Sequence, residues 1–169
     1  NTLIEVAKNR GFKVWVKESP TLNDITYARL RVTLRKYFDK EIKERLTILN
    51  KIYKYSVKSL EEAIRATKYN DLVLYYTALI DEANHMLYRI GNLKLMTYLA
   101  IYYKKLAKEI GNKTSKLKNV VVLIISDHGY DPQAHDHSFY GFWSINVQPP
   151  RKPKTILDFK NLILSLLER

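Results

Sequence analysis

All four histidines of the chain lie in short segments that also carry aspartates. His85 follows Asp81 by four residues in the segment IDEANH, a spacing that places both side chains on one side of a first helical turn. His128 is adjacent to Asp127 and precedes Gly129, which permits a sharp turn. Imidazole and carboxylate groups together are typical ligands of zinc, and also of manganese or iron, whereas calcium prefers oxygen ligands alone.

Each pair also has an ordinary structural interpretation. Asp81 could cap a helix that carries a surface histidine, and Asp127-His128 could be a turn with a hydrogen-bonded imidazole. His135 and His137 lie in one further loop with aspartates at 131 and 136. We expect these two aspartates either to bound the loop or to orient an imidazole by accepting its second N–H. The spacing alone leaves these alternatives open.

The segments around the histidines alternate between helical and strand patterns. Helices are expected at 2–10, at 92–110 with an end at Gly111, and at 155–168; strands are expected at 12–16, 71–79, 119–126 and 141–147. This order predicts an α/β fold with a mostly parallel sheet sandwiched between helices. In such folds sites form where the carboxyl ends of the strands meet, and the histidine segments follow predicted strands.

A long amphipathic stretch separates the first two predicted strands. Apolar residues recur three or four apart from about residue 24 to Tyr55, as one helix or as two joined near Phe38. Ser59 and Glu62 form a plausible capping box for a further helix. We therefore expect a helical, cap-like insertion at about 24–66 within a single domain that covers residues 1–169.

Composition limits the remaining possibilities. With 169 residues, 46% of them hydrophobic, the chain is long enough for one domain with its own core. The longest apolar run, VVVLII, is too short for a membrane span, and the chain shows no secretion signal, so a cytoplasmic location without a membrane partner is expected. Because there is no cysteine, any metal must be held by imidazole and carboxylate.

The net charge of +12 favours anionic partners or substrates. The basic residues are spread over the predicted helices, however, which favours an interpretation as solvated helix faces. The many lysines and the few glutamines resemble the composition of hyperthermophile proteins.

The segments IDEANH, LIISDHGY and HSFYGFW resemble the alkaline phosphatase superfamily, in particular its type I phosphodiesterase and nucleotide pyrophosphatase branch with the archaeal members. The resemblance implies a site for two divalent ions, usually zinc, that clamp a phosphoryl group. It assigns Asp81, His85 and His137 to one ion, and Asp127 and His128 to the other. His137 is preferred to His135 because it lies three residues before the aromatic residue of YGF.

The chain departs from that family in two respects. The family also uses an early aspartate for the second ion and a threonine or serine nucleophile, and neither is found in a matching segment here. Since the chain begins with Asn, we expect it to be the later part of a longer enzyme whose upstream segment supplies both groups. The resemblance then implies a hydrolase of phosphoric esters, acting on a phosphate-ester small molecule or a nucleotide.

Two other functions are compatible with the sequence. One is a non-catalytic metal-binding or interaction module that kept the ligands and lacks the nucleophile. The other, less favoured, is a basic helical module that contacts nucleic acid, with incidental histidines.

Overall fold

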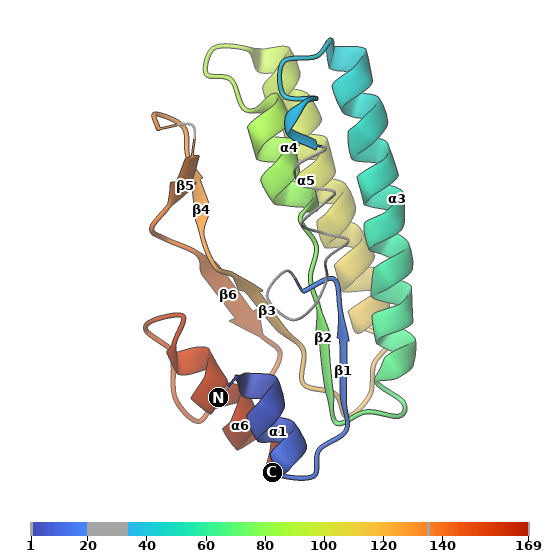
Figure 1. Cartoon of the computed structure of the whole chain (residues 1–169), viewed down its shortest axis with the longest axis vertical. Coiled ribbons are helices and arrows are strands. Elements are labelled where there is room, and N and C mark those ends of the chain that lie inside the picture. The colour runs from blue at the N-terminus through green and yellow to red at the C-terminus, as the bar shows by residue number, and fades with distance from the viewer. Residues whose placement is uncertain (1, 20–33, 135, 169) are drawn as a thin grey trace.

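Helices and strands are mixed along the described part of the chain (Figure 1). The computed structural model describes residues 2–19, 34–134 and 136–168. In chain order the elements are α1 (Leu3–Asn9), β1 (Val14–Lys17), α3 (Ile42–Ala66), β2 (Leu72–Tyr75), α4 (Leu79–Leu87), α5 (Leu93–Thr114), β3 (Leu123–Ser126), β4 (Gly129–Asp131), β5 (Asp136–Ser138), β6 (Phe142–Ile145) and α6 (Asp158–Leu167).

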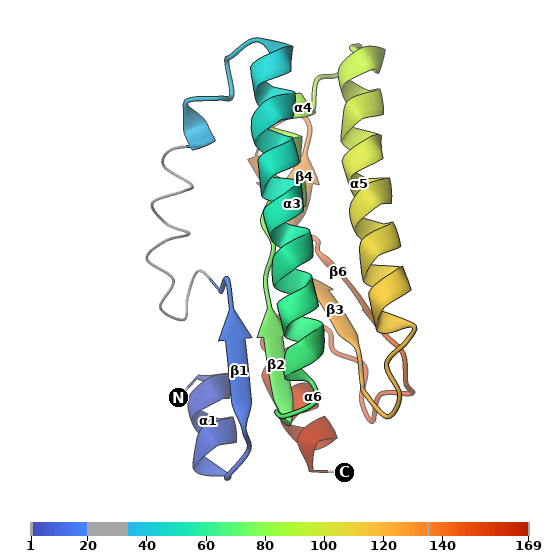
Figure 2. The ribbon, with the colours of Figure 1, turned by 90° about the vertical axis from the view of Figure 1, so that its right-hand side faces the viewer.

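The strands β1 and β2 pair in parallel and lie between helices on both faces. Val14 is in register with Leu72, and successive side chains alternate between the two faces. Leu72 belongs to an apolar cluster with Ala7 of α1 and Leu164 of α6. On the other face the Tyr75 hydroxyl donates to the Ser56 carbonyl of α3, and burial raises the pKa of that phenol to about 12. Helices thus contact both faces of this two-stranded pair, and Figure 2 shows β1 and β2 side by side with α3 running along them.

The sheet itself differs from the prediction of a mostly parallel sheet. In the part of the chain that the structure describes, the strands form three two-stranded sheets, of which only β1–β2 is parallel. β3 pairs with β6 and β4 pairs with β5, both antiparallel. The physical reason is the length of the connections. Parallel strands need a crossover of a dozen or more residues, such as the one that contains α3, whereas β3 to β6 follow one another through short turns.

The largest core cluster lies where α3, α4 and α5 meet. Its buried apolar residues recur at helical spacing on each of the three helices. On the three helices they are Leu49, Ile52, Leu79, Ala83, Met86, Leu87, Leu95, Leu99, Tyr102 and Leu106, and Leu34 from the segment before α3 joins the same cluster. This burial holds α4, a short helix of 9 residues, against two much longer helices.

The predicted insertion at 24–66 is only partly within the described residues, since 24–33 lie outside them. The rest contains α3, which packs against β1, β2, α4 and α5. No helix begins at the predicted capping box: Ser59 is buried inside α3, which continues from Ile42 to Ala66. The apolar residues before and after Ser59 lie on the same face of one continuous helix. Burial of this face therefore outweighs the preference of Ser59 and Glu62 for a helix start.

The helices expected at 2–10 and 92–110 are present as α1 and α5, with shifted boundaries. Thr2 and Glu5 form a capping box at the start of α1. The Asn92 side chain caps α5 by accepting from the Leu95 N–H. Gly111 lies inside α5 instead of ending it. Among the described residues, none of the helices combines the length and the hydropathy needed to cross a bilayer.

Leu49→Ala tests the central role of the three-helix core. The Leu49 side chain is 0% exposed, so we expect a cavity that lowers the free energy of unfolding by about 2–5 kcal/mol. Leu93→Ala is the control, because Leu93 is 81% exposed and should change stability by less than about 0.5 kcal/mol. Urea unfolding followed by far-UV circular dichroism measures both. Equal losses in the two variants would contradict this assignment of the core.

Candidate metal centre

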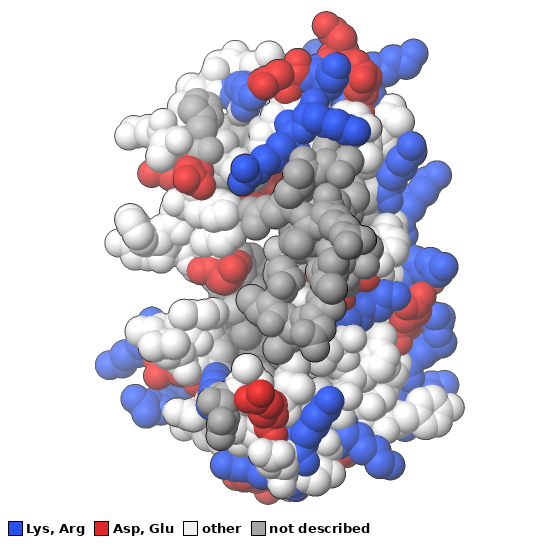
Figure 3. All heavy atoms as spheres, in the orientation of Figure 1, with Lys and Arg blue, Asp and Glu red and all other residues white. Residues whose placement is uncertain are grey.

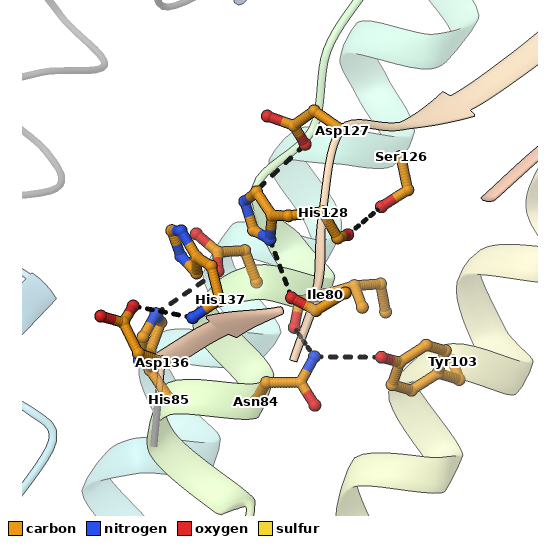
Figure 4. A network of polar contacts seen from close by, with 11 residues as sticks. Ile80, Asn84, His85, Tyr103, Ser126, Asp127, His128, Asp136 and His137 are labelled. Atoms are coloured by element: carbon orange, nitrogen blue, oxygen red, sulfur yellow. Dashed lines mark hydrogen bonds and ion pairs between the residues drawn. The ribbon is translucent and has the colours of Figure 1, made fainter. Parts of the chain in front are cut away.

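Three segments that are distant in the sequence meet beside the first turn of α4 (Figure 4). Asp81 lies in that turn and His85 follows one turn later. Asp127 and His128 form the link between β3 and β4, and His137 is the middle residue of β5. The pairing of Tyr130 with His137 places the second and third segments side by side.

Asp81, His128 and His137 each offer one possible ligand atom, and these three atoms all lie within 4.8 Å of one another. The Asp81 Oδ1 atom is 3.3 Å from His137 Nε2 and 3.4 Å from His85 Nε2. Two ligands of a tetrahedral zinc ion at about 2.0–2.1 Å are separated by about 3.3 Å. The distances around Asp81 therefore fit joint binding of one cation. The Asp81 side chain is only 12% exposed, which limits competition from water.

The rings of the three described histidines have two different mutual orientations. His128 and His137 are stacked, with ring centroids 3.6 Å apart and planes inclined by 13°. His85 and His137 are 5.6 Å apart and inclined by 57°. A metal ion lies near the plane of an imidazole that binds it, because the nitrogen lone pair lies in that plane. The orientation of the rings therefore constrains which histidines can share an ion.

The backbone around His128 is fixed by two hydrogen bonds. The Ser126 hydroxyl donates to the His128 carbonyl at 2.6 Å, and His128 Nδ1 lies 3.0 Å from the Gly129 carbonyl. A carbonyl can only accept, so this contact assigns the proton to Nδ1 and leaves Nε2 with a lone pair for a cation. Asp127 Oδ1 is 3.7 Å from that Nε2 atom, and the Asp127 side chain is 67% exposed.

Aromatic side chains surround His85. Phe38 stacks on the imidazole with centroids 5.4 Å apart, and Tyr130 meets it edge-on at 5.6 Å. Burial raises the pKa of the Tyr130 phenol, which keeps it neutral beside the ligands. Both residues restrict the rotation of His85. These roles are not predicted from the sequence, since Phe38 belongs to an apolar stripe whose spacing indicates only core packing.

Gly141 lets the start of β6 approach the end of β3. A Cβ atom at this position would lie 1.9 Å from the Ser126 carbonyl oxygen. At Gly129 a Cβ atom would lie 2.6 Å from the Ser138 hydroxyl oxygen. These contacts bring the Asp127-His128 turn and the His137 strand together. The glycine in the YGF segment was visible in the sequence, but its contact with Ser126 depends on strand pairing.

The five predicted ligands are therefore grouped in one region of the molecule. Asp81, His128 and His137 form the compact group, and His85 and Asp127 each lie beside one of its members. The alternative ligand His135 lies outside the described residues. Asp131 and Asp136 bound the loop, since Asp131 accepts from the Gln133 N–H and Asp136 from the His137 N–H.

Comparison of the chain with protein-family models, curated proteins and solved structures finds no match in any of the three. The interpretation of the site therefore depends on its donors. A partly buried carboxylate surrounded by imidazole nitrogens is suited to a divalent transition metal.

Gly141→Ala tests whether close backbone packing holds the site together. The added methyl group must displace Ser126, so we expect a loss of about 1–3 kcal/mol in unfolding free energy and weaker metal binding. Gly111→Ala is the control, because no atom outside the neighbouring turns of α5 lies within 4 Å of the position that its methyl group would take, and alanine favours the helix by up to about 1 kcal/mol. Thermal unfolding should thus shift in opposite directions. A neutral Gly141→Ala would refute the role of this contact.

Proposed function

We propose that this chain is the metal-binding part of a hydrolase of phosphoric esters that uses two divalent ions, similar to phosphodiesterases and nucleotide pyrophosphatases. The observation that carries the proposal is the stacking of His128 on His137 beside the Asp81 carboxylate. Sequence resemblance and geometry support the same division of the ligands between two ions.

Stacked imidazoles argue against one shared ion. An ion in the plane of His137 cannot also lie in the plane of His128, because planes inclined by only 13° do not intersect near the nitrogens. Asp81, His128 and His137 are close enough to share one ion, but the orientation of the two rings argues against a single site with these three ligands. Two ions beside rings 3.6 Å apart agree with the separation of about 3.5–4 Å in two-metal sites.

The first ion would be held by Asp81, His85 and His137. The rings of His85 and His137 are inclined by 57°, so that nitrogen lone pairs of both can be directed at one ion. The second would be held by Asp127 and His128, which provide only two ligands, one of them largely exposed. Zinc suits this donor set best, with manganese or iron as alternatives. The incomplete second set supports the proposal that an aspartate from an upstream segment completes it.

The nucleophile is also proposed to come from outside these residues. The two described hydroxyls nearest to the ligands in sequence, Ser126 and Ser138, are both directed at backbone carbonyls, those of His128 and Tyr140. When bound, the two ions would stabilise the entering and leaving oxygens of an in-line displacement at phosphorus. The substrate would be a phosphate-ester small molecule or a nucleotide.

A non-catalytic metal-binding module is the second candidate. It is favoured by the same incomplete second set of ligands, if no upstream segment completes it. The two functions differ in their affinity for phosphate, because a catalytic centre must leave coordination positions open for the ester.

Zinc stoichiometry tests the division of ligands. After reconstitution and desalting we expect close to one tightly bound zinc ion per chain by elemental analysis, held at the site of Asp81. Asp81→Ala should abolish this binding, whereas Asp127→Ala, the matched control, should leave the tight ion in place and weaken only a second one. Loss of the tight ion in both variants would favour a single shared site, and absence of zinc from the wild type would refute the metal centre.

Phosphate binding tests the proposed chemistry. Titration of the zinc-loaded chain with inorganic phosphate and with a nucleoside monophosphate should give saturable binding in calorimetry. Chelation of zinc or His137→Ala should remove that binding. A zinc-loaded chain that binds neither ligand would support the non-catalytic module instead.

A further inference from the structure

The outward side of α3 carries a row of basic side chains. Lys51, Lys54, Lys58 and Arg65 recur at helical spacing on the side opposite the buried residues, and all four are exposed. We call these four residues the α3 basic stripe. It extends over about 21 Å, given a rise of 1.5 Å per residue. Lys and Arg line the margin of the molecule along which α3 runs (Figure 3).

The acidic residues near the α3 basic stripe form ion pairs with lysines outside it. From Lys51 to the end of α3 the acidic residues are Glu61 and Glu62. Glu61 binds Lys113 at 2.9 Å, and Glu62 binds Lys17 of β1. Lys113 also pairs with Glu109 at 3.4 Å, and both Glu61 and Glu62 lie in the field of Arg65 as well. The four cations of the stripe outnumber these two carboxylates, so the stripe presents net positive charge to solvent.

Two neighbouring hollows lie at the end of the stripe. One, of about 380 Å³, is lined by Trp15, Arg65 and Tyr69 and also by Glu62. The second, of about 400 Å³, is lined by Lys13, Lys68 and again Tyr69, and also by Asp71, whose carboxylate accepts from the Lys13 backbone N–H. Tyr69 is 75% exposed. Aromatic rings beside cationic groups form a surface on which bases can stack while phosphates are neutralised.

We propose that the α3 basic stripe and the two hollows at its end bind single-stranded nucleic acid. The stripe provides the charge for a phosphate backbone, and Trp15 and Tyr69 provide rings for bases. An anionic membrane fits this surface less well, because membrane-bound helices insert an apolar face. The apolar face of α3 is already buried against α4 and α5.

This surface is separate from the metal centre. The hollows lie where the chain enters β2, at Asn70 and Asp71, whereas Asp81 follows the other end of that strand. Binding should therefore persist without metal, which distinguishes this proposal from the phosphoric-ester hydrolase.

The test is fluorescence anisotropy of labelled oligo-dT and oligo-U with the full chain in the presence of EDTA. If the four cations of the stripe contact phosphates, affinity should fall about 50-fold between 50 and 200 mM salt. The triple change Lys51→Glu, Lys54→Glu and Lys58→Glu should weaken binding at least tenfold at low salt. It should also reduce the steepness of the plot of log affinity against log salt concentration, the salt slope, by about 2. Tyr69→Ser should weaken binding without changing the slope.

The matched control is the triple change Lys94→Glu, Lys104→Glu and Lys108→Glu, which alters the charge equally at exposed positions of α5. It should retain most of the affinity and the full salt slope. Equal losses from both triple changes would overturn the proposal, because net charge alone would then explain binding. Failure to bind either oligonucleotide at 50 mM salt, or binding only to phosphatidylserine vesicles, would also overturn it. Circular dichroism checks the folding of each variant. If the triple Glu variant unfolds, the same three lysines are changed to Gln, and this variant should show the same weakening of binding in direction.

Discussion

The burial of α4 between α3 and α5 is the interaction on which the candidate site depends. Leu79, Ala83, Met86 and Leu87 are fully buried and fix the rotation of this helix about its axis. Asp81 and His85 are thereby turned toward Tyr130 of β4 and His137 of β5. A short helix of 9 residues has little stability of its own. The position of the carboxylate is therefore a consequence of packing by residues that never touch a ligand.

Local features of the fold could be predicted from the sequence because they depend on neighbours in the chain. The starts of α1 and α5 are such cases, since both lie within one residue of the expected starts at 2 and 92. Ser59 shows the limit of this reasoning: its capping pattern is genuine, but the surrounding apolar stripe keeps it inside a helix. Strand partners depend on connection length and on contacts between distant segments. For this reason the prediction of a mostly parallel sheet fails for β3 to β6.

The candidate ligands could be predicted from residue type and spacing. Their geometry could not be predicted in this way. The i, i+4 spacing of Asp81 and His85 corresponds to a contact of 3.4 Å on α4. The stacking of His128 on His137 could not be derived in this way, because it requires the register of β4 with β5 and the close approach at Gly141. Distance and ring orientation lead to different groupings of the ligands. Orientation is the stronger criterion, since a lone pair has a direction.

The separation between the metal centre and the α3 basic stripe bears on why the chain is so basic. Positive charge can attract an anionic substrate over a range set by screening, about 8 Å at physiological ionic strength. The four residues of β2 alone span about 10 Å. The hollows at the far end of this strand are therefore screened from an anion at Asp81. The Lys51 end of the stripe lies level with α4, since Leu49 and Ile52 pack in one cluster with Leu79 and Ala83. Attraction of a substrate to the metal centre therefore does not explain the positive charge around the hollows, and a ligand bound directly there explains it better.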